Sequence, residues 1–262
     1  MSGPVEVHHV EGGRPDGPPL VLSNSLGTTM AMWDPQMVAL GERFRLIRYD
    51  TRGHGSSPVP PGPYDVADLG ADLLALLDRL GIDRASLCGL SIGGMTAMWV
   101  AANAPERVDR LALCSTSARF DSPERYAERA AIVRAEGMAP VANTAVRRWF
   151  TERFASEQPR VVDEFHDMLL ATPPEGYAAC CGVVERTDLT PSIGSIAAPT
   201  LLLAGADDPS TPPPHAERIA ARVAGARVVV LPGSHLLNVE RADEASRAIL
   251  DHLSVPTPEE EP

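Results

Sequence analysis

The sequence predicts an α/β fold in which a mostly parallel β-sheet carries helices on both faces. Short apolar runs alternate with segments of helical periodicity along most of the 262 residues, as expected for strands joined by helical crossovers. Two of the runs, LALC and TLLLAG, are continuously apolar, which is typical of strands covered on both faces. A chain of this length can bury a large core as one α/β domain.

The individual elements follow from the same patterns. Strands are expected at Val5–Val10, Leu20–Ser23, Arg45–Tyr49, Ala85–Gly89, Arg110–Cys114, Thr200–Gly205 and Arg227–Leu231. Helices are expected at Val66–Leu80, Ile92–Asn103, Pro214–Val223 and Asp243–Leu253.

One long segment interrupts this alternation. Between about Arg119 and Ser192 the strand pattern stops, and charged helical stretches such as TAVRRWFTERF take its place. We therefore expect a core formed by residues 1–118 and 193–253, with a helical cap inserted at 119–192. Residues 254–262, rich in Pro and Glu, are expected to form a disordered tail or the stub of a linker.

Charge and cysteine content exclude several classes of partner and site. The formal net charge is -12, whereas binding to nucleic acid or to anionic membranes depends on clustered Lys and Arg. The N-terminus lacks a basic start with an apolar region, and no later run approaches about 18 apolar residues, so a cytoplasmic protein is expected. Cys88 and Cys114 fall in expected strands, and Cys180 and Cys181 are adjacent. Their spacing matches no metal site, so we expect reduced, structural thiols.

The strongest chemical motif is Gly89-Leu90-Ser91-Ile92-Gly93, a G-x-S-x-G between an expected strand and an expected helix. In this context the motif forms a sharp turn that presents a nucleophilic serine, as in the α/β-hydrolase fold. The glycines are needed because side chains there would collide with neighbouring backbone. The Ile92 amide lies at a helix N-terminus, where it can stabilise an oxyanion. We therefore expect this fold, with its eight-stranded type of sheet, and Ser91 as the nucleophile.

A serine needs an imidazole base and a carboxylate that orients the imidazole. In this fold the chain order is Ser, Asp or Glu, then His. Of seven histidines, only His235 follows the last expected strand and precedes the last helix on a Gly-Ser loop. The preceding strand ends at GADD, which offers Asp207 and Asp208, and chemistry alone allows either.

Related hydrolases carry G-x-x-D at this place, and that resemblance selects Asp208. More broadly, the chain resembles 3-oxoadipate enol-lactonases through NSLGTTMAMWDPQ, YDTRGHGSS, GLSIGGMTAMW, RRWFTERF, GADDPSTPP and GSHLLNVE. Many relatives have His-Gly where this chain has Asn24-Ser25. The resemblance implies a second oxyanion donor at the Leu26 amide, and places Ser25 and Trp149 beside the substrate.

The resemblance implies hydrolysis of 3-oxoadipate enol-lactone to 3-oxoadipate, a step of the β-ketoadipate pathway of aromatic catabolism, with no metal and no organic cofactor. The substrate is a small lactone or ester that carries a carboxylate, for which Arg147, Arg148, Arg134 or Arg52 are candidate partners. Some relatives are fused to a decarboxylase of the pathway, so fusion to or association with such an enzyme is a further expectation.

Several other functions fit the same residues. A carboxylesterase, a C–C bond hydrolase and a cofactor-free perhydrolase would use the same triad. A dehalogenase or epoxide hydrolase is disfavoured, because these enzymes have Asp where Ser91 stands. A non-catalytic ligand-binding protein of this fold is the remaining alternative from another class.

Overall fold

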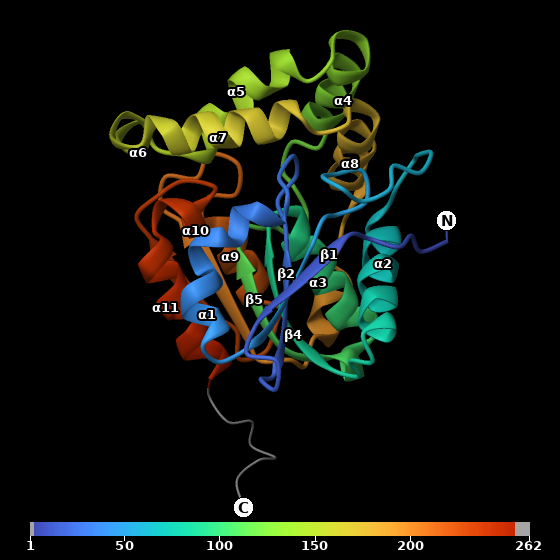
Figure 1. Ribbon diagram of the computed structural model, residues 1–262, viewed down its shortest axis with the longest axis vertical. Helices are drawn as coiled ribbons and strands as arrows, with labels where there is room; N and C mark the ends of the chain where they lie inside the picture. Colours follow the sequence, from blue (N-terminus) through green and yellow to red (C-terminus); the bar gives the residue numbers. More distant parts are fainter. Residues whose placement is uncertain (1–2, 255–262) are drawn as a thin grey trace, which may run out of the picture.

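A computed structural model describes residues 3–254 of the chain, and within them one sheet has seven strands in the order β1-β3-β2-β4-β5-β6-β7 (Figure 1). The strands are β1 (His9–Gly13), β2 (Pro19–Ser23), β3 (Arg45–Tyr49), β4 (Ala85–Leu90), β5 (Val108–Cys114), β6 (Thr200–Gly205) and β7 (Arg227–Leu231). Only β1 runs antiparallel to its neighbour. The predicted α/β fold with a mostly parallel sheet is therefore confirmed, with one strand fewer than the eight expected.

The first strand differs from its prediction. Val5–Val10 was expected, but pairing with β3 begins at His9 and continues to Gly13. Upstream of it, the Val5 amide donates to Asp72 Oδ1 at 2.7 Å and the His8 amide donates to Ser57 Oγ at 2.8 Å. Because these amides bind side chains from distant segments, this stretch is extended without being part of the sheet.

Helices cover both faces of the sheet. The helices α1 (Met37–Gly41) and α11 (Ala242–Leu253) contact each other on one face, and α2 (Val66–Arg79) and α3 (Ile92–Asn103) contact each other on the other (Figure 1). Further along, α9 (Pro213–Ala220) packs on β6 and β7, and α10 (Leu237–Glu240) precedes α11. Short 3-10 helices lie at Met30–Gln36, Pro105–Arg107 and Ile193–Ser195.

Local sequence explains the two helices nearest the nucleophile. Asp65 and Asp68 form a reciprocal capping box at the start of α2, which satisfies amides that the first turn leaves without partners. Helix α3 is apolar all round and almost wholly buried, as a helix in the middle of a large fold is. The start of α3, directly after β4, is therefore rigidly placed.

Five helices lie above one end of the sheet, between β5 and β6 in sequence (Figure 1). They are α4 (Glu124–Glu136), α5 (Ala139–Trp149), α6 (Glu152–Glu157), α7 (Pro159–Leu170) and α8 (Pro174–Arg186). We call these five helices the cap. Their place agrees with the expected insertion, while the boundaries at 119 and 192 stay a prediction. Of the expected tail, only Ser254 lies within the described residues.

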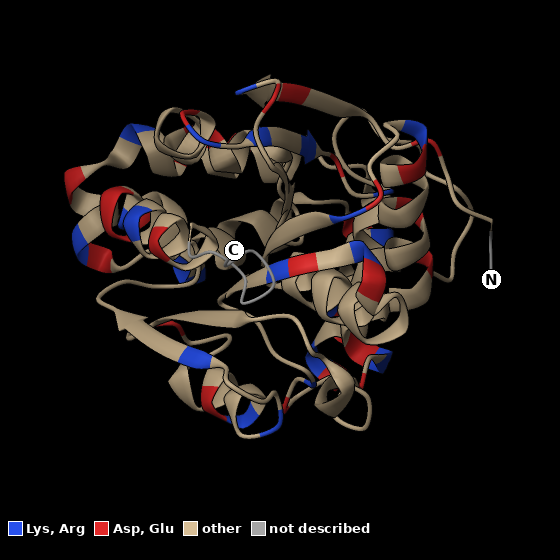
Figure 2. Cartoon of the chain, turned by 90° about the horizontal axis from the view of Figure 1, so that it is seen from below, with Lys and Arg blue, Asp and Glu red and all other residues tan. Residues whose placement is uncertain are grey.

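Charged residues of both signs are spread over the helices and loops around the sheet, as Figure 2 shows from below. Strands β4 and β6 are buried along their whole length. All four cysteines are buried and unpaired. In residues 3–254 no helix is both long enough and apolar enough to cross a membrane.

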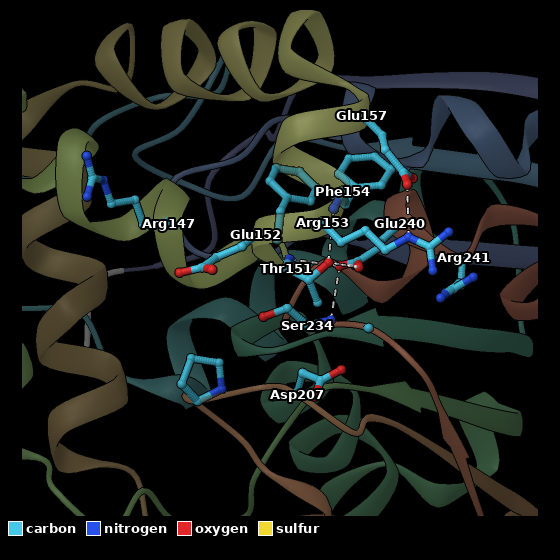
Figure 3. A pocket seen from close by; sticks show the side chains of 13 residues that line it. Arg147, Thr151, Glu152, Arg153, Phe154, Glu157, Asp207, Ser234, Glu240 and Arg241 are labelled. Carbon is cyan, nitrogen blue, oxygen red and sulfur yellow. Dashed lines mark hydrogen bonds and ion pairs between the residues drawn. The ribbon is translucent and has the colours of Figure 1, made fainter.

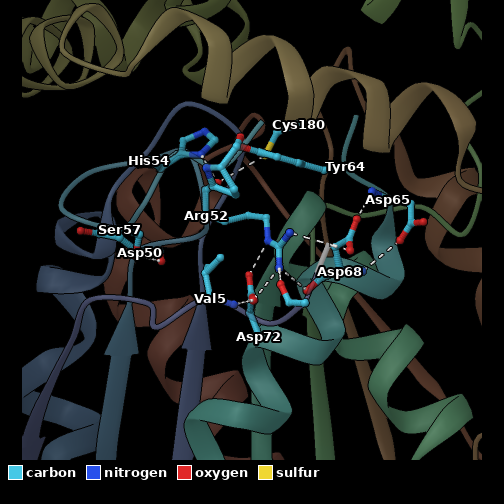
Figure 4. Close-up of polar contacts among 12 residues, drawn as sticks. Val5, Asp50, Arg52, His54, Ser57, Tyr64, Asp65, Asp68, Asp72 and Cys180 are labelled. Carbon is cyan, nitrogen blue, oxygen red and sulfur yellow. Dashed lines mark hydrogen bonds and ion pairs between the residues drawn. The ribbon is translucent and has the colours of Figure 1, made fainter. Parts of the chain in front are cut away.

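A buried cluster around Arg52 holds the loop after β3 in place (Figure 4). The Arg52 guanidinium donates to both carboxylate oxygens of Asp72 at 2.6 Å, and Arg52 is fully buried. Two residues on, His54 Nε2 accepts a hydrogen bond from the Gly27 amide at 2.9 Å. The loop after β3 therefore fixes the loop after β2.

The contact with Gly27 requires a neutral imidazole, because a protonated one has no acceptor nitrogen. Burial lowers the pKa of His54 to about 4, although the Arg52 carbonyl and Asp50 act to raise it. At neutral pH the ring is uncharged and can accept from Gly27.

The cap contacts the core at two glycines, Gly176 of α8 and Gly53 of the loop after β3. A Cβ at Gly176 of α8 would overlap the carbonyl oxygen of Gly53, and a Cβ at Gly53 would lie 2.6 Å from the Gly176 Cα. Gly53 also has a φ of 80°, which favours glycine. This close approach of two backbones sets how near α8 lies to the loop of Arg52 and His54.

We expect Gly176→Ala to lower the free energy of unfolding by about 1–3 kcal/mol, the usual cost of overpacking a tight contact. The loss should appear even though alanine favours a helix by about 1 kcal/mol over glycine. Urea unfolding measures it. Gly194→Ala is the matched control, because its Cβ would meet nothing closer than 3.9 Å. Equal stability of the two variants would contradict the close contact.

We also expect the free energy of unfolding to fall by about 3 kcal/mol between pH 6.5 and pH 4 through His54 alone. The folded-state pKa of His54 lies near 4, below its ordinary value of 6.5. The unfolded chain thus takes up this proton first as the pH falls, and the effect levels off below pH 4. Urea unfolding across this range, compared with His54→Gln, isolates the contribution. The same pH dependence in both proteins would refute it.

Candidate active site

Ser91 lies at the junction of β4 and α3 with a φ of 58° and a ψ of -117°, a conformation that costs a non-glycine residue about 1–3 kcal/mol. Its backbone is held by its own amide, which donates to Cys114 O at 3.0 Å, and by its carbonyl, which accepts from Thr116 Oγ1 at 2.7 Å. A Cβ on Gly89 would overlap the Gly93 carbonyl. The G-x-S-x-G pattern is therefore a steric requirement of this turn.

The amides of Ile92 and Leu26, which both lie near Ser91, have no hydrogen-bond acceptor among residues 3–254. Ile92 begins α3, so its amide points out of the helix N-terminus. Leu26 lies in a turn closed by a hydrogen bond from the Thr28 amide to the Ser25 carbonyl at 3.2 Å, with Gly27 at a φ of 79°. Both expected oxyanion donors are thus free to bind a substrate oxygen.

His235 and Asp208 lie on the loops that follow β7 and β6. The distance from His235 Nδ1 to Asp208 Oδ2 is 2.8 Å, and both side chains are buried. Thr211 Oγ1 donates to the same carboxylate at 2.6 Å, and the Ser210 amide donates at 2.7 Å. Burial acts to raise the pKa of Asp208, but His235 and these two donors outweigh it and lower the pKa to about 2.

The neighbouring Asp207 is placed differently. Its side chain is exposed and lines an outer groove rather than the region around Ser91, as Figure 3 shows. Its amide donates to the Gly233 carbonyl at 2.9 Å. The structure therefore brings Asp208, and not Asp207, to the imidazole.

A narrow cavity of about 20 Å³ connects the expected residues. Its lining includes Ser91, His235 and Leu26, together with Ser25 and Trp149, the two residues expected to lie beside a substrate. The cap contributes the opposite wall. The sequence-derived site residues thus converge on one place, with Asp208 behind His235 and the Ile92 amide next to Ser91.

The cap wall of this cavity is positively charged. Arg129 and Arg148 line it, and neither has a carboxylate within ion-pair distance in the described part of the chain. Arg129 Nη1 donates to the Tyr177 hydroxyl at 3.3 Å, while Arg148 Nη2 donates to the Pro209 carbonyl at 3.1 Å. The Arg148 Nε is buried without a hydrogen-bond partner.

The two guanidinium groups also affect each other. Burial, followed by the charges of Arg125 and Arg129, lowers the pKa of Arg148. All three arginines line a second cavity of about 170 Å³, which shares Tyr126, Arg129, Arg148 and Ser210 with the cavity at Ser91. A bound anion would relieve this repulsion.

Of the four arginines proposed from sequence, only Arg148 lines the cavity. Arg134 pairs with Glu175 at 3.0 Å, Arg52 belongs to the buried cluster of Figure 4, and Arg147 lines the outer groove of Figure 3. Sequence reasoning missed Arg129. The only signal was its i, i+3 spacing from Tyr126, which places the two on one helix face.

Among residues 3–254, no three His, Cys, Asp or Glu side chains are grouped as metal ligands. The chemistry available to the described residues is that of a hydroxyl, an imidazole and a carboxylate, with two free amides beside the hydroxyl. This set suits acyl transfer to serine followed by hydrolysis.

Comparison with known proteins agrees with the fold. Residues 18–242 match the family described as alpha/beta hydrolase fold. 3-Oxoadipate enol-lactonase 2 of Acinetobacter baylyi is 38% identical over 94% of this chain and 92% of its own.

Two solved structures are similar as well. The enol-lactonase of Burkholderia xenovorans LB400 superposes with a TM-score of 0.94 at 42% identity, over 96% of this chain and 97% of that one. A thermophilic esterase of Thermogutta terrifontis gives a TM-score of 0.89 at 33% identity, over 95% and 93%. The fold, the serine turn and these similarities together show that the chain belongs to the α/β-hydrolase family and is a hydrolase of this fold.

Proposed function

We propose that the protein hydrolyses 3-oxoadipate enol-lactone to 3-oxoadipate through an acyl-enzyme on Ser91. The observation that carries the proposal is the pair of cap arginines, Arg129 and Arg148, which line the cavity of Ser91 and His235 without carboxylate partners among the described residues. The enol-lactonases similar to this chain support the choice of substrate. With it, the reaction belongs to the β-ketoadipate pathway of aromatic catabolism.

The first half of the reaction opens the ring. His235 accepts the proton of Ser91 Oγ as the oxygen attacks the lactone carbonyl, and the amides of Ile92 and Leu26 bind the oxyanion. The ring C–O bond then breaks and expels an enolate. Protonated His235 returns its proton to this leaving group, which becomes the ketone.

The second half releases the product. A water molecule gives a proton to His235 and attacks the acyl-enzyme carbonyl, the Ser91 ester bond breaks, and Ser91 recovers its proton from His235. Asp208 accepts the hydrogen bond from His235 Nδ1 throughout. Because the pKa of Asp208 is about 2, this carboxylate stays ionised at neutral pH.

An acidic protein needs a local positive site to bind an anionic substrate. The chain carries a formal net charge of -12, which disfavours approach of a carboxylate. Arg129 and Arg148 oppose this field at the cavity, where bidentate hydrogen bonds to a carboxylate are available. Ser25 and Trp149 line the same cavity and would contact the rest of the substrate.

Binding requires the cavity to widen. Its volume of about 20 Å³ is far below the roughly 300 Å³ of ordinary ligand pockets. The adjoining cavity of about 170 Å³ is separated from it by the side chains that both share. We propose that displacement of Tyr126, Arg129 and Arg148 merges the two cavities and admits the lactone.

We expect Asp208→Asn to lower kcat about 10³–10⁴-fold, because the amide would stabilise the wrong tautomer of His235 and leave its charge unopposed. Asp207→Asn is the matched control one residue away, with an exposed side chain that does not contact His235, and it should retain wild-type turnover. Steady-state hydrolysis of p-nitrophenyl acetate by both variants measures the difference. The assignment of the acid is wrong if Asp207→Asn shows the larger loss.

We expect the purified protein to open 3-oxoadipate enol-lactone, followed by loss of its ultraviolet absorbance, and Ser91→Ala to abolish this activity. Arg129→Gln should raise KM for the lactone about 10- to 100-fold, because a charged hydrogen bond to the substrate carboxylate is lost. The same variant should hydrolyse neutral p-nitrophenyl acetate normally. Arg134→Gln, which removes a cap arginine already paired with Glu175, serves as its control.

The outcomes separate the candidate functions. Rapid hydrolysis of the neutral ester with no attack on the lactone would identify a carboxylesterase instead and contradict the proposal. If the wild-type protein hydrolyses no activated ester faster than Ser91→Ala does, the protein is non-catalytic.

A further inference from the structure

The loop of His235 is attached to the cap on both sides of the imidazole. Ser234 Oγ donates to the Arg148 carbonyl at 2.9 Å, and the Leu236 amide donates to the Trp149 carbonyl at 2.9 Å. These acceptors lie in the last turn of α5, the same turn that sends the side chains of Arg148 and Trp149 into the cavity. The backbone of the cap is therefore bonded to the loop of the catalytic base.

A carboxylate completes this junction from the floor of the outer groove (Figure 3). Glu240 Oε2 accepts from the Ser234 amide at 3.1 Å and from the Thr151 amide at 3.2 Å, and Glu240 Oε1 accepts from the Thr151 hydroxyl. Thr151 is the N-cap of α6, with its own hydroxyl accepting from the Phe154 amide. One side chain thus joins the start of α6 to the residue before His235.

Outside this junction the loop is restrained by the contact of His235 with Asp208, by a hydrogen bond from Arg241 Nε to the Pro232 carbonyl at 2.9 Å, and by one further backbone bond. It runs from the end of β7 at Leu231 to the start of α10 at Leu237, and it contains Gly233 at a φ of 138°, where the backbone is most permissive. The Gly233 carbonyl accepts from the Asp207 amide. The amide of Ser234 has Glu240 as its acceptor.

We infer that Glu240 is a positioning residue for the proposed base: its carboxylate fixes the backbone at Ser234 so that the His235 imidazole is aimed at Ser91. The inference rests on the proposed function only in taking His235 as the base. It assigns to Glu240 no contact with substrate. It also makes α6 part of the support of the catalytic loop.

Three hydrogen-bond donors, the amides of Ser234 and Thr151 and the Thr151 hydroxyl, converge on position 240, which explains why a carboxylate suits this position. An ionised Glu accepts hydrogen bonds only, and its two oxygens can receive the three donated by Ser234 and Thr151. Glutamine keeps one oxygen for the two amides, and its NH₂ group can donate to the Thr151 hydroxyl. Glu240→Gln is therefore the conservative variant, and Glu240→Ala removes all three bonds.

The expected kinetic effect lies in kcat. Misplacement of a catalytic group by about 1 Å can cost on the order of 100-fold in rate, and His235 moves a proton in both halves of the reaction. Contacts of substrate with Arg129 are unaffected by the loss of Glu240. We therefore expect Glu240→Ala to lower kcat about 10- to 100-fold for the anionic lactone and for neutral p-nitrophenyl acetate alike, with KM unchanged.

The test compares Glu240→Ala and Glu240→Gln with Glu157→Ala, which removes another carboxylate of the same groove whose ion-pair partner is Arg153. Competent sites are counted by stoichiometric reaction of Ser91 with diethyl p-nitrophenyl phosphate, so that kcat refers only to folded enzyme. The downfield proton resonance of His235 Nδ1 reports the geometry of the imidazole directly. Thr151→Val removes one of the three bonds to Glu240, together with the N-cap bond from the Phe154 amide, and gives a smaller effect of the same kind should Glu240→Ala fold poorly.

The inference is supported if Glu240→Ala loses kcat per competent site, shifts the His235 resonance, and is largely restored by glutamine, while Glu157→Ala matches wild type. It is overturned if kcat per competent site is unchanged and only thermal stability falls, or if only KM rises. His235→Ala is measured in parallel. If that variant keeps full activity, the proposed function itself fails, which is a different result from normal kcat in Glu240→Ala with an inactive His235→Ala.

Discussion

The candidate active site depends on the close approach of Gly93 to the end of β2. A Cβ at Gly93 would overlap the carbonyl oxygen of Ser23, so only glycine lets the start of α3 lie this near the neighbouring strand. Strands β2 and β4 are paired in parallel, with Ser23 opposite Gly89, and loops at the carboxyl ends of adjacent parallel strands meet at one edge of a sheet. This contact brings the turn of Leu26 beside the helix that begins with Ile92.

The parts of the site that sequence reasoning found share a local signature. Ser91, Asp208 and His235 each lie in a loop that directly follows a strand of the parallel sheet, so recognising the strands was enough to bring the three loops to one edge. The turn at Ser91 also has a steric requirement that the five-residue G-x-S-x-G motif shows directly in the sequence. These features are short in sequence, and their geometry follows from the strand before them.

What sequence reasoning missed depends on contacts between distant segments. The first strand was placed too early because the amides of Val5 and His8 bind side chains 67 and 49 residues away, and an apolar pattern does not show such bonds. Arg129 was overlooked because an arginine on a helix is usually solvated, and its lack of a carboxylate partner becomes visible only when the cap is folded. The hydrogen bond from the Gly27 amide to His54 likewise joins two loops whose contact no sequence pattern shows.

The molecule uses arginine in two opposite ways, and the contrast bears on the cap. Arg52 is buried against Asp72, where a fully paired charge holds two segments together and would be costly to leave alone. Arg129 and Arg148 have no carboxylate partner among the described residues, so their charges face the cavity without being neutralised. Arg148 joins α5 to the core through a hydrogen bond from Nη2 to the Pro209 carbonyl at 3.1 Å, but neither side chain forms an ion pair with the core in the described residues. The cap must also be anchored by other groups, and the backbone of α5, at Arg148 and Trp149, provides them by binding the loop of His235. Under the proposed function, the turn that offers positive charge to a substrate is thus also the turn that supports the base, so that a change in its backbone would alter recognition and proton transfer together.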